Sequence, residues 1–204
     1  YGMTENTATI SLPPRNGDPR YGSSGICLPY TEIRIVELNE NNEILRDCAT
    51  DEIGDILVKG PGLIPGYLDD QINQEVFLEG DWFKTGDLGR MDKDEYLWVT
   101  GRTKDVIIRS GHNIDPLMIE NALRAHDAVA LVAAVGQPDA YAGELPVAFV
   151  QLKPKQQVEI KELLALASDT ISDWVAVPKE IVIVDALPLT AVGKIFKPDI
   201  RKLA

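Results

Sequence analysis

The stretch "GRTKDVIIRSGHNI", residues 101–114, marks the point at which the character of the chain changes. Arg102 ends one apolar run, and the adjacent charged residues Lys104 and Asp105 precede the next. A glycine loop follows at Gly111. Charged residues between two domains form either a solvated linker or a hinge. The stretch therefore predicts a domain boundary near Lys104, with domains 1–102 and 103–204.

The first domain is expected to be a small antiparallel β subdomain. Short runs of β-branched residues alternate with turn residues, and Pro and Gly interrupt the beginning of the chain. The expected elements are loops over residues 1–24 (Pro19 among the breakers), strands within 26–37 and 54–60, a short helix within 67–78, and a hairpin over 82–102 with its turn at Asp92, Lys93 and Asp94.

The second domain alternates strands and helices, which predicts a compact α+β unit and an α+β fold class for the whole chain. Residues 114–126 predict a helix with Asp115 as its N-cap and Pro116 at its first position. Apolar residues at helical spacing predict a second helix within 158–174. The expected strands lie within 104–110, 128–136, 145–153 and 180–185.

Composition narrows the classes of partner. The 204 residues are 45% hydrophobic, which is enough for a sizeable core, and 20 basic against 32 acidic residues give a net charge of −12. Such a surface repels nucleic acid and anionic membranes, and no apolar run approaches the length of a membrane span. Two well-separated cysteines, Cys27 and Cys48, indicate a reducing, cytoplasmic location, and with two histidines they argue against a zinc site.

A Gly-Lys pair at Gly193-Lys194 raises the possibility of phosphate binding. The nucleotide-binding P-loop requires Gly five positions before the pair and Ser or Thr after it, but Pro188 and Ile195 occupy those positions. What remains is a tight loop with Lys194 at its tip. Such a lysine is either an ordinary surface residue or a compact charge delivered to a developing anion.

Two further segments carry polar groups suited to a nucleotide. In "YGMTE", residues 1–5, an aromatic ring, a flexible Gly, a hydroxyl and a carboxylate suit base stacking, phosphate approach and Mg²⁺ binding, unless the segment is simply a terminal loop. In "KTGDLG", residues 84–89, Asp87 is placed either to accept both hydroxyls of a ribose or to stabilise its own turn.

Taken in order, four motifs resemble the adenylate-forming (AMP-binding) superfamily, which includes acyl-CoA synthetases, luciferases and peptide-synthetase adenylation domains. The motifs are Tyr-Gly-x-Thr-Glu at residues 1–5, Thr-Gly-Asp at 85–87, Gly-Arg-x-Lys-Asp at 101–105 and Pro-x-x-x-x-Gly-Lys at 188–194. The resemblance covers the whole chain. It implies the end of the large N-terminal domain followed by the complete, mobile C-terminal domain.

The resemblance implies that ATP binds mainly to the first domain. The ring of Tyr1 would stack against adenine, Gly2 and Thr4 would approach the phosphates, and Asp87 would bind the ribose hydroxyls with help from Arg102.

The resemblance also implies a two-step reaction. Glu5 would hold Mg²⁺, and Lys194 would enter the site for adenylation, with Gly193 giving its loop the freedom to insert. Lys104 would be the hinge about which the C-terminal domain rotates. The loop Ser110-Gly111-His112 would then face the thiol of CoA, although His112 by itself resembles an ordinary loop residue.

The expected activity is that of an acid–thiol ligase acting on a carboxylic acid, ATP and CoA. The loop Ser110-Gly111-His112 has one Gly where many members have two, which favours CoA as the acyl acceptor over the phosphopantetheine of a carrier protein. The other alternative is a non-catalytic relic of the fold. The family's phosphate loop and most of its acid pocket lie upstream of Tyr1, so this chain alone is expected to be inactive. The acid (fatty, aryl or small) and the oligomeric state stay open.

Overall fold

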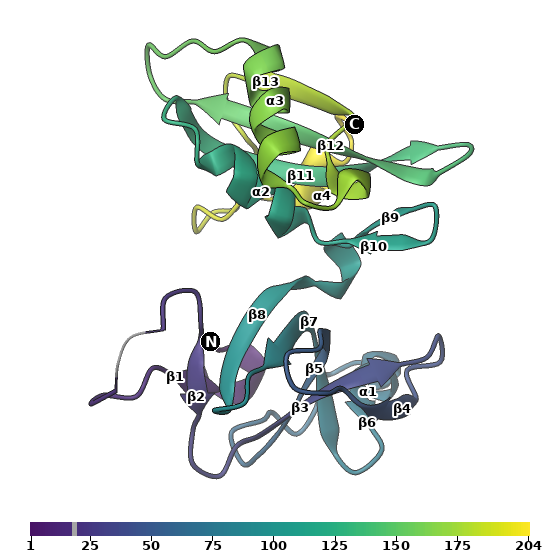
Figure 1. Cartoon of the computed structure of the whole chain (residues 1–204). Helices are drawn as coiled ribbons and strands as arrows, with labels where there is room; N and C mark the ends of the chain where they lie inside the picture. The colour runs from purple at the N-terminus through teal and green to yellow at the C-terminus, as the bar shows by residue number, and fades with distance from the viewer. Residues whose placement is uncertain (18–19) are drawn as a thin grey trace. The chain divides into compact units, whose positions relative to one another are not determined.

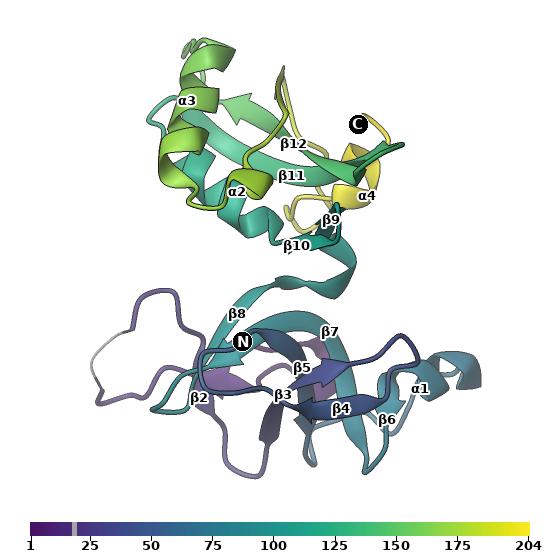
Figure 2. The ribbon, with the colours of Figure 1, turned by 45° about the vertical axis from the view of Figure 1, so that its right-hand side comes forward.

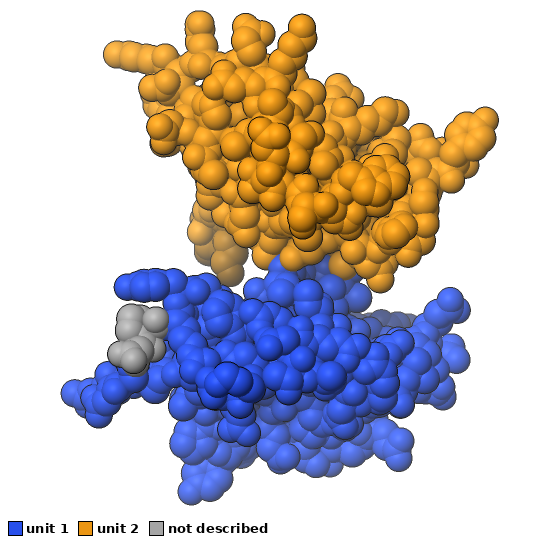
Figure 3. Space-filling view, in the orientation of Figure 1, with its two compact units in different colours: residues 1–103 blue, residues 104–204 orange. Residues whose placement is uncertain are grey.

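The computed structural model describes residues 1–17 and 20–204, and its contacts divide the chain into two compact units (Figure 3). The first unit is Tyr1–Thr103 and the second is Lys104–Ala204. Pro19, one of the expected loop residues, lies outside the described residues.

Within the described residues, the first unit forms one eight-stranded antiparallel sheet (Figure 1), as expected from its short β runs. Its strand order is β1-β2-β8-β7-β5-β3-β4, and β6 pairs with β7. The elements are η1 (Thr4–Asn6), β1 (Ser11–Leu12), β2 (Gly25–Cys27), β3 (Glu32–Leu38), β4 (Ile44–Asp47), β5 (Gly54–Lys59), α1 (Asp70–Val76), β6 (Phe77–Leu78), β7 (Trp82–Met91) and β8 (Tyr96–Arg102).

Two expectations for this unit need correction. Residues 1–24 are not all loop, because a 3₁₀ turn forms at Thr4–Asn6 and β1 pairs with β2. Because Pro and Gly disfavour regular structure, the secondary-structure propensities of this segment did not indicate its short edge strand. Strand β4 was also missed, because it is a largely exposed edge strand without the alternating burial that identifies strands.

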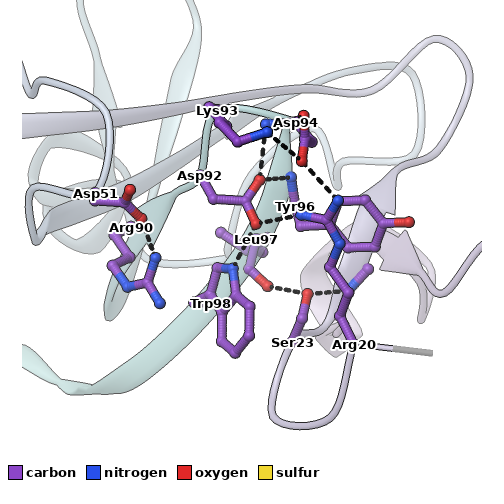
Figure 4. Close-up of polar contacts among 11 residues, drawn as sticks. Arg20, Ser23, Asp51, Arg90, Asp92, Lys93, Asp94, Tyr96, Leu97 and Trp98 are labelled. Atoms are coloured by element: carbon purple, nitrogen blue, oxygen red, sulfur yellow. Dashed lines mark hydrogen bonds and ion pairs between the residues drawn. The ribbon is translucent and has the colours of Figure 1, made fainter. Parts of the chain in front are cut away.

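The predicted β7–β8 hairpin is confirmed, and Asp92 organises its turn (Figure 4). Oδ1 of Asp92 accepts from the backbone amides of Asp94 (2.9 Å) and Tyr96 (3.0 Å). Oδ2 accepts from Nε1 of Trp98 (3.0 Å) and from Arg20 (2.8 Å). Burial alone raises the pKa of Asp92, but these hydrogen bonds outweigh it and lower the pKa from 3.8 to about 2.

The second unit is an α+β layer structure, also as expected (Figure 2). Within the described residues its sheet has five strands, in which β12 pairs antiparallel with β11 and β9 and parallel with β13. The elements are η2 (Thr103–Asp105), β9 (Ile107–Arg109), β10 (His112–Ile114), α2 (Pro116–Arg124), β11 (Val129–Asp139), β12 (Gly143–Leu152), α3 (Ile160–Thr170), η3 (Trp174–Ala176), β13 (Glu180–Val184) and α4 (Lys197–Ile200).

Both faces of β12 are covered. Ala148 and Val150 belong to the core cluster that includes residues of α2 and α3, whereas Val147 and Phe149 pack in a second cluster with Ile200 of α4. Figure 2 shows α2 and α3 on one side of β11 and β12 and α4 on the other. Coverage of both faces explains why this strand reads as a continuous apolar run rather than as an alternating one.

The N-terminus of α2 is confirmed as predicted. Asp115 is its N-cap and accepts from the amide of Leu117 (2.9 Å), and Pro116 occupies the first turn. The strand expected over 104–110 is shorter, because η2 occupies Thr103–Asp105 and only Ile107–Arg109 is extended. In the described residues no helix is long and apolar enough to cross a membrane.

We predict that Asp92→Asn destabilises the first unit in a pH-dependent manner. Because the folded pKa of Asp92 is depressed, its stabilising contribution is complete above about pH 4 and disappears as the pH falls towards about 2. Urea unfolding of wild type and variant should therefore show a stability gap at pH 6 that closes by pH 2. A gap of the same size at both pH values would contradict this assignment.

Candidate functional site

Tyr1, Asp87 and Arg102, which belong to three separate sequence motifs, meet on the sheet of the first unit. Asp87 and Arg102 are cross-strand partners in the β7–β8 ladder. Nε of Arg102 donates to Oδ1 of Asp87 (2.9 Å), and the hydroxyl of Tyr1 donates to Oδ2 (2.5 Å). The Asp87 carboxylate is thus held in one orientation by a cation and a phenol.

The backbone around Asp87 is fixed by Thr85. Its hydroxyl donates to the carbonyl of Ile56 on the neighbouring strand (2.8 Å) and accepts from the amide of Asp87 (3.1 Å). Between them, Gly86 adopts a positive φ of 73°, and a Cβ there would meet no atom within 4 Å. The Asp87 side chain is 14% exposed, so the carboxylate is largely covered yet still reachable.

A cavity of about 340 Å³ lies beside this carboxylate and is lined by Glu5, Tyr67, Thr85, Asp87 and Arg102, among others. The hydroxyl of Tyr67 donates to Oε1 of Glu5 (2.7 Å). Burial, and next the hydrogen bond to Glu5, raises the pKa of Tyr67 to about 12. A second carboxylate–phenol pair therefore faces the same cavity, whose volume lies in the range of small-ligand sites.

Tyr1 is also held as a neutral donor. Burial is the main cause that raises the pKa of its phenol, and the hydrogen bond to Asp87 adds to it. The ring is partly buried against the apolar cluster that contains Ile10, Ile35 and Leu97. Stacking of this ring on a base stays a prediction.

Glu5 is the residue proposed for Mg²⁺. In the described part of the chain, no three His, Cys, Asp or Glu side chains gather as a ready-made metal site. Mg²⁺, however, usually keeps several waters and takes one or two carboxylates together with substrate phosphates. The carboxylate of Glu5, which lines the cavity, fits a site of that shared kind.

Gly2 has a packing role. A Cβ on Gly2 would lie 1.6 Å from the carbonyl oxygen of Ala8, so the loop can close on itself only with Gly at this position. Thr4 starts η1, and its side chain is exposed. The approach of either residue to a phosphate stays a prediction.

Lys194 lies in the second unit, on a hydrogen-bonded hairpin turn. The amide of Thr190 donates to the carbonyl of Lys194 (2.7 Å), and the amide of Gly193 donates to the carbonyl of Thr190 (2.9 Å). The Thr190 hydroxyl also accepts from the amide of Lys194 (3.1 Å). Gly193 has a φ of 80°, so we interpret it as the residue that closes the turn rather than as a source of freedom.

Ser110 and Gly111 form a two-residue hairpin turn between β9 and β10. Both have positive φ (51° and 82°), which is the geometry of a type I′ turn. The amide of Ser110 donates to the carbonyl of Ala142 (2.7 Å), and Ser110, Gly111 and His112 are all exposed. The loop proposed to face the thiol is thus a tight, hydrogen-bonded turn.

Lys104 lies in η2, with an exposed side chain, at the first position of the second unit. The second unit thus contains the predicted site residues Lys104, Ser110-Gly111-His112 and Lys194. In the first unit the structure brings together Tyr1, Asp87 and Arg102, with Glu5 on the same cavity. Gly2 and Thr4 belong to the first unit as well.

Sequence reasoning missed a buried ion pair behind the Lys194 hairpin. Nζ of Lys197 lies 2.7 Å from Oε1 of Glu120, and the amide of Ala134 donates to the same oxygen (3.0 Å). The Glu120 side chain is 6% exposed and the Lys197 side chain 16%. An acidic residue next to Ile119 on the apolar face of α2 was the available signal for a buried charge.

Comparison with protein families gives matches in both units. A model of the AMP-binding enzyme matches residues 1–68, and a model of the AMP-binding enzyme C-terminal domain matches residues 118–194.

Individual relatives agree. The chain is 51% identical to marinolic acid–CoA ligase of Pseudoalteromonas sp. (strain SANK 73390) over 97% of this chain and 30% of that protein. It is 30% identical to ATP-bound MatB from Rhodopseudomonas palustris (TM-score 0.91; 100% of this chain, 39% of that one). It is 33% identical to O-succinylbenzoate coenzyme A synthetase (MenE) from Bacillus subtilis in complex with ATP and magnesium ion (TM-score 0.81; 96% and 39%). The chain thus spans well under half the length of these relatives.

We predict that Glu120→Gln lowers the free energy of unfolding of the second unit by about 3 kcal/mol, because it leaves the Lys197 ammonium without its counter-charge. Glu120→Gln combined with Lys197→Met should recover most of that loss, since both charges are then absent. Chemical denaturation of the four forms of the cycle measures the coupling. Equal, additive losses from the two substitutions would contradict a mutually dependent pair.

Proposed function

Because this chain belongs to the AMP-binding enzyme family, we propose that it is the C-terminal part of an AMP-forming acyl-CoA ligase. In this proposal the first unit belongs to the large N-terminal domain, and the second unit is the mobile C-terminal domain. The observation that carries the proposal is the Asp87 carboxylate, held by Tyr1 and Arg102 beside a cavity that Glu5 also lines.

We propose that Asp87 binds the ribose of ATP. A carboxylate has about four acceptor positions, so hydrogen bonds from Tyr1 and Arg102 leave capacity for two sugar hydroxyls. A carboxylate that pairs with Arg102 offers acceptors only, which suits hydroxyl donors. Tyr1 offers its ring to the adenine, and Thr4 offers its exposed hydroxyl to the α-phosphate.

In the first half-reaction, the substrate carboxylate attacks the α-phosphate of ATP, and pyrophosphate leaves. Two anions meet and a third departs, so negative charge accumulates in the transition state. Lys194, which is exposed on its hairpin turn, neutralises that charge, and a cation that acts mainly on the transition state increases the rate. Mg²⁺, when bound, supplies further neutralisation at the phosphates, and Glu5 is the residue that holds it.

In the second half-reaction, a thiol attacks the carbonyl carbon of the acyl-adenylate and AMP leaves. We propose that rotation about Lys104 withdraws Lys194 and presents the Ser110-Gly111-His112 turn instead. A tight, hydrogen-bonded turn suits this task, because its backbone is already ordered before the thiol binds.

The relatives' names support CoA as the acceptor rather than a carrier protein, and an acid–thiol ligase rather than a non-catalytic relic. They name different acids, so we propose only a carboxylic acid as the substrate. The cytoplasmic location inferred from the separated cysteines stays a prediction.

We predict that Lys194→Ala in the full-length protein lowers the rate of adenylation by about 10²–10³-fold, the usual cost of losing one transition-state charge contact. Transfer from preformed acyl-adenylate to CoA should remain within a few-fold of wild type, because Lys194 has then left the site. Pyrophosphate exchange and thioester formation measure the two steps separately. Lys202→Ala, a neighbouring exposed lysine, is the matched control; equal loss of both steps in Lys194→Ala would argue against domain alternation.

We also predict that the 204-residue chain alone catalyses no acid-dependent exchange of pyrophosphate into ATP, because the family's phosphate loop lies outside it. Radiolabelled pyrophosphate incorporation, with the full-length protein as the positive control, checks this. Measurable exchange by the isolated chain would mean that the residues described above suffice for adenylation.

A further inference from the structure

Arg201 lies near the end of the second unit in the sequence, but its side chain contacts the proposed hinge at the beginning of that unit. One of its nitrogens, Nη2, donates both to the carbonyl oxygen of Lys104 (2.9 Å) and to Oδ1 of Asp105 (2.7 Å). The Asp105 side chain is 14% exposed and the Arg201 side chain 34%. These contacts join residues 97 and 96 positions apart in the sequence, and no motif predicted them.

The anchor of Arg201 is itself firmly held. Arg201 follows α4, whose Ile200 is fully buried in the core cluster beneath β12. At the other end of α4, Lys197 is fixed by the buried carboxylate of Glu120. The guanidinium is therefore attached to the packed body of the second unit and not to a loose tail.

The carbonyl of Lys104 belongs to the planar peptide group that joins Lys104 to Asp105. A hydrogen bond to this oxygen, together with an ion pair to the next side chain, holds that plane against the second unit. Rotation is then possible only about bonds that precede the plane, namely φ and ψ of Lys104 and those of Thr103. Without the clamp, the freedom would spread into Asp105 and Val106.

We propose that Arg201 is a positioning residue that fixes the C-terminal side of the hinge, so that domain rotation is confined to the backbone bonds of Lys104 and Thr103. This inference rests on the hinge of the proposed function and adds the residue that limits the number of backbone bonds free to rotate there. A sharp hinge gives two well-defined end states, and the same α4 segment that carries the clamp follows directly after the Lys194 hairpin.

The clamp can be tested on the 204-residue chain with a lysine-specific protease. Arg201→Gln should raise cleavage of the Lys104–Asp105 bond about tenfold relative to cleavage at Lys155, an exposed lysine in the loop between β12 and α3, because only the hinge peptide loses its anchor. Lys202→Gln, which removes the adjacent exposed charge, should leave the ratio unchanged. Mass spectrometry of the early fragments gives both rates in one digest.

Two results would overturn the inference. An unchanged ratio in Arg201→Gln would mean that the contact does not restrain the hinge peptide. Equal acceleration at Lys104 and Lys155 would mean that Arg201 only stabilises the second unit as a whole. The digest does not depend on ligase activity of this protein. Its outcome is therefore independent of the Lys194→Ala experiment, which tests the proposed function.

Discussion

The candidate site depends on the cross-strand register that sets Asp87 opposite Arg102. Side chains alternate along a strand, so a slip of one residue would turn the carboxylate to the other face of the sheet. The hydroxyl of Thr85, bonded to the neighbouring strand β5, and the Asp92 turn at the far end of the same hairpin both oppose such a slip. Charge placement in the first unit is therefore a consequence of strand pairing.

In the second unit, ion pairs position the short C-terminal helix α4. A four-residue helix is too short to be stable on its own. Buried Ile200, the Glu120–Lys197 pair and the Arg201 contacts hold it instead. The hairpin that carries Lys194 immediately precedes this helix, so the proposed catalytic lysine and the proposed hinge are joined to one body by a few ionic contacts.

The sequence predicted the parts whose signals are local. The β7–β8 hairpin, the capped start of α2 and the residues Tyr1, Asp87 and Arg102 all lie in short motifs. Strand β4 and helix α4 were missed because exposed edges and short helices lack periodicity. Tyr67 and Glu120 were missed because contacts across 60 or more residues, Tyr67 with Glu5 and Glu120 with Lys197, follow from tertiary packing. The Gly193 turn shows the same limit: its glycine was visible, but its role required the backbone geometry.

The two-sided burial of β12 has a consequence for biosynthesis. Helix α2 is synthesised before β12 and α3 soon after it, but Leu187 and Ile200, which cover the opposite face, follow dozens of residues later. Until both Leu187 and Ile200 have been synthesised, the face of β12 that carries Val147 and Phe149 lacks part of its native cover. A nascent chain that stalls before that point displays an apolar sheet face, the kind of surface that chaperones and proteases recognise.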